Sequence, residues 1–98
     1  MLTKKTILGV LKTKKSLLAT YGVNNIGLFG SFVGNNQKSD SDIDILVDFK
    51  SSEETFDNLM SIYDVLEKSF KNYKVDIVTK NGLSEHIGSY ILKETEYA

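Results

Sequence analysis

The stretch Gly30–Phe49, GSFVGNNQKSDSDIDILVDF, joins a Gly-Ser pair to two aspartates that flank one isoleucine at the start of an apolar run. Side chains of an extended strand alternate between two faces, so Asp42 and Asp44 point one way and Ile43 and Ile45 the other. One face of this predicted strand packs into a core, and the other presents acids. Taken alone, Asp-x-Asp is also typical of turns in which aspartate bonds the nearby backbone.

A further aspartate, Asp76, lies within the apolar run YKVDIVT of residues 73–79. A carboxylate is disfavoured there without a partner, and the chain has no arginine to provide one. If the two strands are neighbours, Asp42, Asp44 and Asp76 converge, and their repulsion raises the pKa of at least one of them. A divalent cation relieves that repulsion, and hard ions prefer carboxylate oxygens that they share with substrate phosphates. The sequence therefore predicts a Mg²⁺ or Mn²⁺ site.

Gly30 and Ser31 are suited to the other half of a phosphate site. Glycine allows a sharp turn and close approach of the backbone to a ligand, and a helix that begins at Ser31 would point free N–H groups at an anion. The Ser31 hydroxyl can donate a further hydrogen bond. A tight exit from a strand would explain the pair equally well, so the interpretation depends on its position opposite the acids.

Composition predicts one ordinary globular domain over residues 1–98, with 41% hydrophobic and 26% charged residues. The net charge of −1 gives no global field that would attract nucleic acid, and we expect no direct nucleic-acid binding. The absence of cysteine excludes disulfides and thiolate chemistry. With no signal peptide and no long apolar run expected, the sequence favours a cytoplasmic protein that does not enter a membrane.

Periodicity predicts the order α-β-α-β-α-β-α, an α/β (α+β) class with a small mixed sheet of three or more strands and about four helices. A capping box at Ser51 and Glu54 is expected to start the second long helix. The expected helices cover residues 3–21, 31–34, 51–70 and 83–97, and the expected strands cover residues 24–29, 42–49 and 73–79.

Several of these motifs carry a family resemblance. Gly30-Ser31, the Asp42-Ile43-Asp44 motif ten residues later and the distant Asp76 resemble the minimal nucleotidyltransferases (MNT) of the polymerase-beta-like nucleotidyltransferase superfamily. The phrases LFGSF, SDSDIDILVDF, KVDIVTK and ILKETEYA are similar as well, and the resemblance covers residues 24–98.

The resemblance implies a polymerase-beta-like fold and a carboxylate triad that binds two metal ions with ATP as substrate. Asp42 and Asp44 would ligate both ions, Asp76 would hold the catalytic ion and help activate the acceptor hydroxyl, and Gly30 and Ser31 would hold the β- and γ-phosphates. It further implies an antitoxin that transfers AMP to a tyrosine of a HEPN-domain toxin.

The loop departs from the family pattern, because Gly34 stands where relatives commonly have arginine. Lys38 could replace that charge, although a loop lysine is usually solvated. An alternative function is therefore an inactive antitoxin that acts by binding alone, and another is transfer to a small molecule or an RNA end. A homo-oligomer is also possible.

Six other side chains are assigned roles away from the chemistry. His86 is interpreted as an exposed or capping residue rather than a general base. Core or interface rings are expected at Tyr63, Tyr90 and Tyr97. Asp40 is assigned to a turn and Asp48 to the surface.

Overall fold

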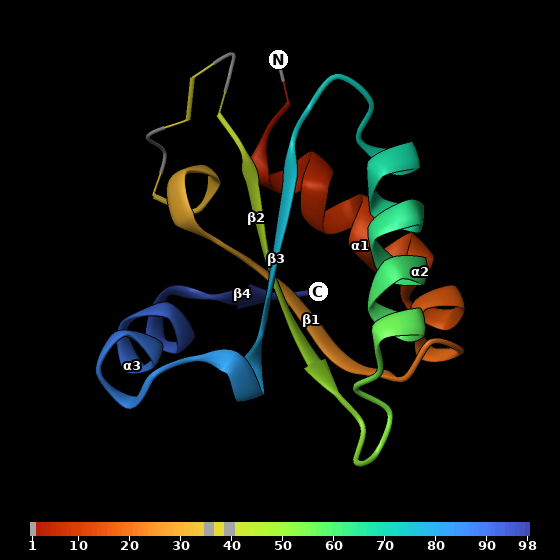
Figure 1. Ribbon diagram of the computed structural model, residues 1–98. Coiled ribbons are helices and arrows are strands. Elements are labelled where there is room, and N and C mark those ends of the chain that lie inside the picture. Colours follow the sequence, from red (N-terminus) through yellow and green to blue (C-terminus); the bar gives the residue numbers. More distant parts are fainter. Residues whose placement is uncertain (1, 35–36, 39–40) are drawn as a thin grey trace.

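The computed structural model describes residues 2–34, 37–38 and 41–98 (Figure 1). Its long helices are α1 (Lys4–Ala19), α2 (Phe56–Ser69) and α3 (Glu85–Glu94), and the short 3-10 helices are η1 (Gly30–Phe32) and η2 (Lys80–Gly82). The strands are β1 (Val23–Phe29), β2 (Ile43–Phe49), β3 (Val75–Thr79) and β4 (Glu96–Tyr97). Within the described ranges no helix has both the length and the apolar character needed to cross a membrane.

The strands form one mixed sheet in the order β3-β2-β1-β4. β1 pairs antiparallel with β2 and with β4, whereas β2 pairs parallel with β3. The parallel pair is joined by α2, as a parallel connection requires a crossover. The predicted α+β class with a mixed sheet is confirmed.

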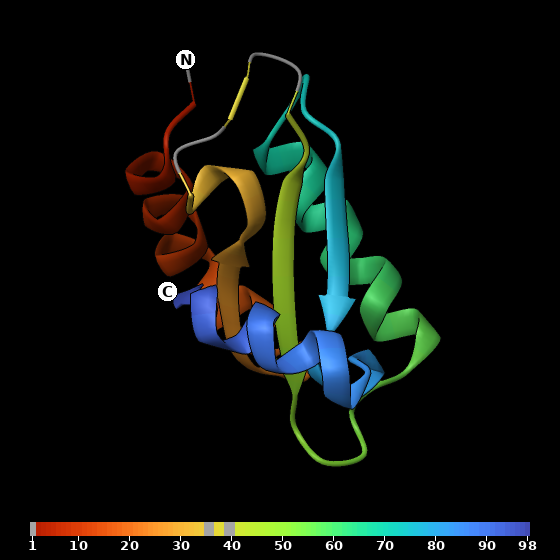
Figure 2. The same ribbon diagram turned by 90° about the vertical axis from the view of Figure 1, so that its left-hand side faces the viewer.

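α1 and α2 cover one face of the sheet, and η1 and α3 lie on the other, as the two views in Figures 1 and 2 agree. The alternation predicted for β2 is present, because Ile43, Ile45, Val47 and Phe49 all belong to the buried core cluster. Ile7 and Leu11 of α1 and Ile62 and Leu66 of α2 join them, each with 0% exposure. The opposite face of β2 is left to the acids.

The first helix begins and ends as its sequence indicates. Thr3 is its N-cap, and the Thr3 hydroxyl accepts a hydrogen bond from the Thr6 N–H. Gly22 follows the helix with φ of +86°, a left-handed conformation that glycine adopts without steric cost.

The expected start of the second long helix is wrong. The helix begins at Phe56, and its N-cap is Thr55, whose hydroxyl accepts from the Asn58 N–H at 3.1 Å. Ser51 and Ser52 instead form a turn, in which the Lys50 N–H donates to the Gly22 carbonyl at 2.8 Å. Ser51 of the expected capping box therefore lies in the turn that ties β2 to Gly22, and Glu54 accepts from Asn81 Nδ2 at 3.3 Å instead.

Two other predicted elements differ from the structure. The helix count is slightly different, because the short helix near Ser31 is the 3-10 helix η1, which leaves three α-helices among the described residues. The last helix ends at Glu94 rather than Tyr97, and the chain then pairs with β1 as β4. A two-residue strand has no periodicity by which sequence analysis could detect it.

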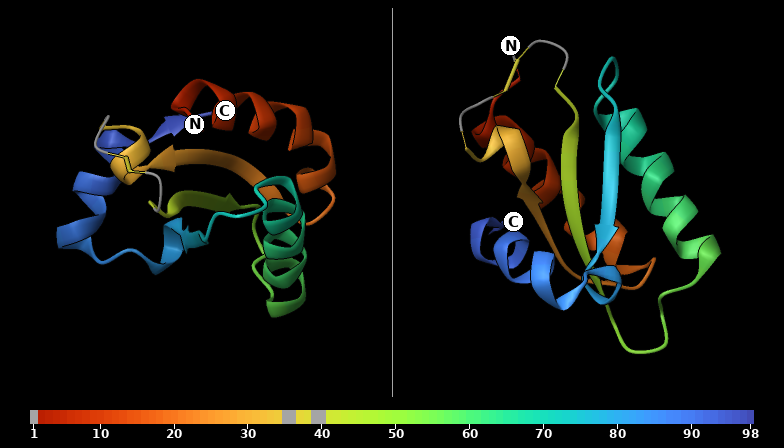
Figure 3. Two further views of the ribbon diagram at one scale, coloured as in Figure 1. Left: turned by 90° about the horizontal axis from the view of Figure 1, so that it is seen from above. Right: turned by 60° about the vertical axis from the view of Figure 1, so that its left-hand side comes forward.

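Close approach between β4 and β1 depends on Gly27. A Cβ atom at Gly27 would lie 2.5 Å from Thr95 Cγ2 and 3.0 Å from the Glu96 carbonyl oxygen. The Gly27–Tyr97 and Leu28–Glu96 pairs and the Ala98 N–H, which donates to the Ile26 carbonyl at 2.9 Å, hold the segment in place. Figure 3 shows the terminal segment returning beside β1 and α1.

We predict that Gly27→Ala destabilises the protein by about 1–3 kcal/mol, because the added methyl group overpacks the β1–β4 contact. Urea unfolding measures the change. Gly9→Ala is the matched control: nothing lies within 4 Å of a Cβ at Gly9 in α1, so this variant is expected to gain roughly 0.5–1 kcal/mol. Equal effects of the two substitutions would contradict the prediction.

Candidate active site

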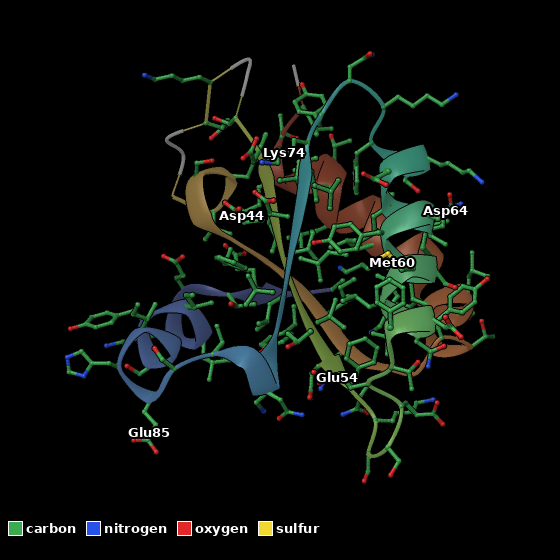
Figure 4. All side chains as sticks on the ribbon, in the orientation of Figure 1. Asp44, Glu54, Met60, Asp64, Lys74 and Glu85 are labelled. Atoms are coloured by element: carbon green, nitrogen blue, oxygen red, sulfur yellow. The ribbon has the colours of Figure 1, made fainter. Side chains whose placement is uncertain are left out.

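The aspartates singled out in the sequence meet where β2 and β3 begin. Asp44 and Asp76 are direct partners in the parallel β2–β3 register, and Asp42 precedes Asp44 by two residues. Asp42, Asp44 and Asp76 are each partly exposed, so their carboxylates border solvent. Asp44 lies on the side of the sheet that carries η1 (Figure 4). The expected neighbourhood of the second and third strands is confirmed.

The Gly30 turn lies directly against Asp44. Phe29 is the antiparallel partner of Asp44, so the chain leaves β1 beside the acid. Gly30 has φ of +79°, and a Cβ atom there would collide with Asp44 Oδ2 and lie 3.0 Å from its Cγ. Phe32, with 1% exposure, fixes η1 to the core. Glycine is required at this position both by its backbone conformation and by the space that Asp44 occupies.

The environment changes the acidity of Asp44. Burial, followed by the negative charges of Asp76, Asp42 and Glu94, raises the pKa of Asp44 from 3.8 to about 6. The sequence predicted a raised pKa from mutual repulsion, and repulsion contributes, although burial is the larger cause.

Two charged residues at the site were missed in the sequence. Lys74 lies 3.9 Å from Asp76 (Nζ to Oδ1), so Asp76 has a basic neighbour despite the absence of arginine. This pair is exposed and long, and contributes little stability. Asp76 is also the second residue of β3 and half-exposed, not enclosed in mid-strand as expected. The spacing of Lys74 two residues before Asp76, on the same strand face, was the available signal.

The second missed residue, Glu94, ends α3. Its Oε1 accepts a hydrogen bond from the Gly30 N–H at 3.1 Å, across 64 positions of sequence. Glu94 lies on the polar side of a predicted helix, and no local pattern in the sequence brings it to Gly30. The contact depends on where the last helix ends and on how β4 returns to β1.

The donor set fits a divalent cation by its chemistry. Carboxylates that repel one another and border solvent are the ligands that Mg²⁺ and Mn²⁺ prefer. As the side chains lie, no group of three or more acidic, histidine or cysteine residues in the described part of the chain has a geometry that could hold a metal ion. Rotation of the carboxylates is therefore required before Asp42, Asp44 and Asp76 could share one.

The structure decides less about Ser31, Lys38 and Asp40, the other residues discussed from the sequence. Ser31 is the second residue of η1, which begins at Gly30 and not at Ser31 as expected, and its side chain is partly exposed. Lys38 is exposed, and its backbone N–H donates to Ser41 Oγ at 2.7 Å, while none of the described ion pairs involves its side chain. Asp40 lies outside the described residues. The phosphate-binding roles of Gly30, Ser31 and Lys38 stay predictions.

The surface assignments are mostly as expected. Asp48 accepts from Asn24 Nδ2 at 3.4 Å, and His86 is exposed on α3. Tyr63 is partly buried, and its hydroxyl accepts from the Ile77 N–H at 3.2 Å. Tyr90 and Tyr97 are 75% and 46% exposed, so neither is a core ring.

A hollow of about 440 Å³ between α1 and α2 is not the candidate site. Its lining includes Val10, Leu17, Lys14, Asp64 and Lys68. Lys68 already pairs with Asp64 at 3.0 Å, and the hollow contains none of the aspartates of β2 and β3. Asp44 lies on the other side of the sheet (Figure 4), and the three aspartates are partly exposed.

Comparison with known proteins decides the family. A family model described as "Polymerase beta, Nucleotidyltransferase" matches residues 11–97. The chain belongs to this family. This nucleotidyltransferase is 38% identical to the "Protein adenylyltransferase MntA" of Thermococcus cleftensis, over 99% of the chain and 97% of that relative. It is 40% identical to a protein of Methanocaldococcus jannaschii described provisionally as a protein adenylyltransferase, over 74% of the chain and 81% of that relative.

Structural comparison agrees with the family. The nucleotidyltransferase aligns with a solved structure described as a minimal nucleotidyltransferase with a TM-score of 0.82 and 27% identity. The alignment covers 97% of the chain and 95% of the solved one. The resemblance seen in the sequence is confirmed, and the chain is an enzyme of the nucleotidyltransferase type. Members of the family generally use a nucleoside triphosphate and divalent metal ions.

We predict that Asp44→Asn stabilises the protein near neutral pH. Because the folded-state pKa is above the unfolded value, wild-type stability falls as the pH rises from about 3.8 to about 6, and the loss persists at higher pH. The variant should gain on the order of 1 kcal/mol at pH 7.5, allowing for solvent screening of a half-exposed group. This corresponds to about 4–8 °C in melting temperature.

Thermal unfolding at pH 3.5 and pH 7.5 checks this expectation. The gain should nearly disappear at pH 3.5, where Asp44 is protonated in the folded state and mostly protonated in the unfolded state. A gain of equal size at both pH values would show that packing, not charge, is responsible. Asp48→Asn is the matched control on the same strand and should change stability little.

Proposed function

We propose that this nucleotidyltransferase transfers AMP from ATP to a protein hydroxyl. The proposal rests on one observation: near full-length similarity to a relative named protein adenylyltransferase, in a chain whose Asp42, Asp44 and Asp76 lie together beside the Gly30 turn. The acceptor that we propose is a tyrosine of a HEPN-domain partner, which makes the protein an antitoxin. That acceptor follows from the resemblance to minimal nucleotidyltransferases.

The residues have separate roles in the proposed reaction. Gly30 and Ser31 would bind the β- and γ-phosphates through the turn, and Asp42, Asp44 and Asp76 would hold Mg²⁺ or Mn²⁺. A bound divalent ion supplies charge neutralisation to the phosphates and stabilises developing charge. Asp76 accepts the proton of the acceptor hydroxyl, whose oxygen forms a bond to the α-phosphorus. The bond between the α-phosphorus and the bridging oxygen breaks, and pyrophosphate leaves.

The electrostatics of the site support a role in binding cations. The charges around Asp44 disfavour its ionised form in the protein alone, and a cation between the carboxylates would remove that penalty. Lys74 stands beside Asp76 and can attract the triphosphate as a point charge. Catalysis then depends on positioning and charge stabilisation, as in other phosphoryl and nucleotidyl transfers.

Transfer of radiolabelled AMP from ATP to the co-purified partner, with Mg²⁺ present, tests the proposal. Wild type should label the partner, and a tyrosine-to-phenylalanine change at the acceptor should abolish the label. The variant Asp42→Asn with Asp44→Asn should lose at least about 100-fold in rate, since the charge stabilisation is lost. Asp57→Asn with Asp64→Asn on α2 is the matched control and should retain the rate. No label with a partner that forms a stable complex would refute the proposal.

Mg²⁺ binding can be tested without activity. Addition of Mg²⁺ should raise the melting temperature of wild type, because an ion that binds the folded state alone stabilises it. The shift should disappear in the Asp42→Asn, Asp44→Asn variant and persist in the α2 control. Equal shifts in all three proteins would indicate a non-specific ionic effect.

A second candidate function is neutralisation of the partner by binding alone, which Gly34 in place of the family arginine favours. Co-expression with the toxic partner separates the two functions. Retained protection by the Asp42→Asn, Asp44→Asn variant would support occlusion. Lost protection with an intact complex would support the transfer reaction.

A further inference from the structure

The hydrogen bond between Glu94 and the Gly30 turn places an internal anion in the proposed phosphate site. Glu94 Oε1 accepts from the Gly30 N–H at 3.1 Å, and the Glu94 charge also acts on Asp44. A carboxylate beside other carboxylates is electrostatically unfavourable, so the position of Glu94 needs a stabilising cause. The hydrogen bond from the Gly30 N–H is one cause. The other is the fixed position of β4, which follows Glu94 along the chain.

β4 determines where Glu94 lies. Its residues Glu96 and Tyr97 pair with Leu28 and Gly27, just before the Gly30 turn. The segment is held further by the ion pair from Lys4 Nζ to Glu96 Oε2 at 2.9 Å. With α3 ended at Glu94 and Glu96 fixed on β1, the Glu94 side chain is held within reach of Gly30. The contact follows from the fold and does not require a ligand.

We propose that Glu94 competes with the nucleotide for the Gly30 turn, an inference that rests on the function proposed above. In the free protein the Glu94 carboxylate accepts the hydrogen bond of the Gly30 N–H. A bound triphosphate takes that N–H with a phosphate oxygen, and Glu94 must move away. The exposed Glu94 side chain can rotate into solvent without displacement of β4. Glu94 thereby lowers the affinity for phosphates and leaves the affinity for the base and the sugar unchanged.

Calorimetric titration of the folded protein with Mg²⁺-ATP tests this competition. Glu94→Gln keeps the shape and an accepting oxygen but removes the charge, so the bond from the Gly30 N–H loses its charge-assisted part. ATP should bind roughly three- to tenfold more tightly, which corresponds to about 0.7–1.4 kcal/mol. Glu85→Gln removes the same charge from the same helix, at a side chain that points away from Asp44 (Figure 4), and should leave the affinity unchanged. Inorganic triphosphate should show the same gain for Glu94→Gln as ATP.

The outcomes separate this inference from the proposed function. If wild type binds ATP and Glu94→Gln binds it equally or more weakly, Glu94 supports the turn or the metal site and the competition is refuted. An equal gain with Glu85→Gln would attribute the effect to net charge and refute it as well, as would a gain in affinity for adenosine. Failure of both folded wild type and Glu94→Gln to bind ATP or triphosphate would refute the nucleotide site itself, and the competition with it.

Discussion

The parallel pairing of β2 and β3 is the constraint on which the site depends. Its register places Asp44 directly beside Asp76, and the antiparallel partner of Asp44 on the other strand is Phe29. The chain must then turn at Gly30 in the space that the Asp44 carboxylate leaves free. A shift of one residue in this register would exchange the faces of β3 and separate the acids.

The two faces of β2 have different roles in the protein. Ile43, Ile45 and Val47 are fully buried under α1 and α2, and their burial stabilises the strand. That stability is what allows acids on the opposite face to remain close together in spite of their repulsion. The short strand β4 adds an edge to the sheet and delivers Glu94 to the same face, so the end of α3 contributes to the site as well.

Sequence reasoning succeeded where the signal was local. Alternation along β2 located Asp42 and Asp44, and an acid within an apolar run identified Asp76. It failed where tertiary contacts determine the structure. β4 has only two residues, too few to show the alternation of a strand, and the contact of Glu94 with Gly30 has no local signature in the sequence. Thr55 caps α2 in place of Ser51 because the preceding turn binds Gly22. The metal ligation and the phosphate contacts of Ser31 and Lys38 are not decided by the fold, because they require a ligand.

The raised pKa of Asp44 has a consequence for the history of the chain. A descendant released from selection for chemistry would gain stability by replacing Asp44 with a neutral residue, so mutation would remove this charge before it removed the core. Fold stability and the retention of an acid therefore oppose one another at this position.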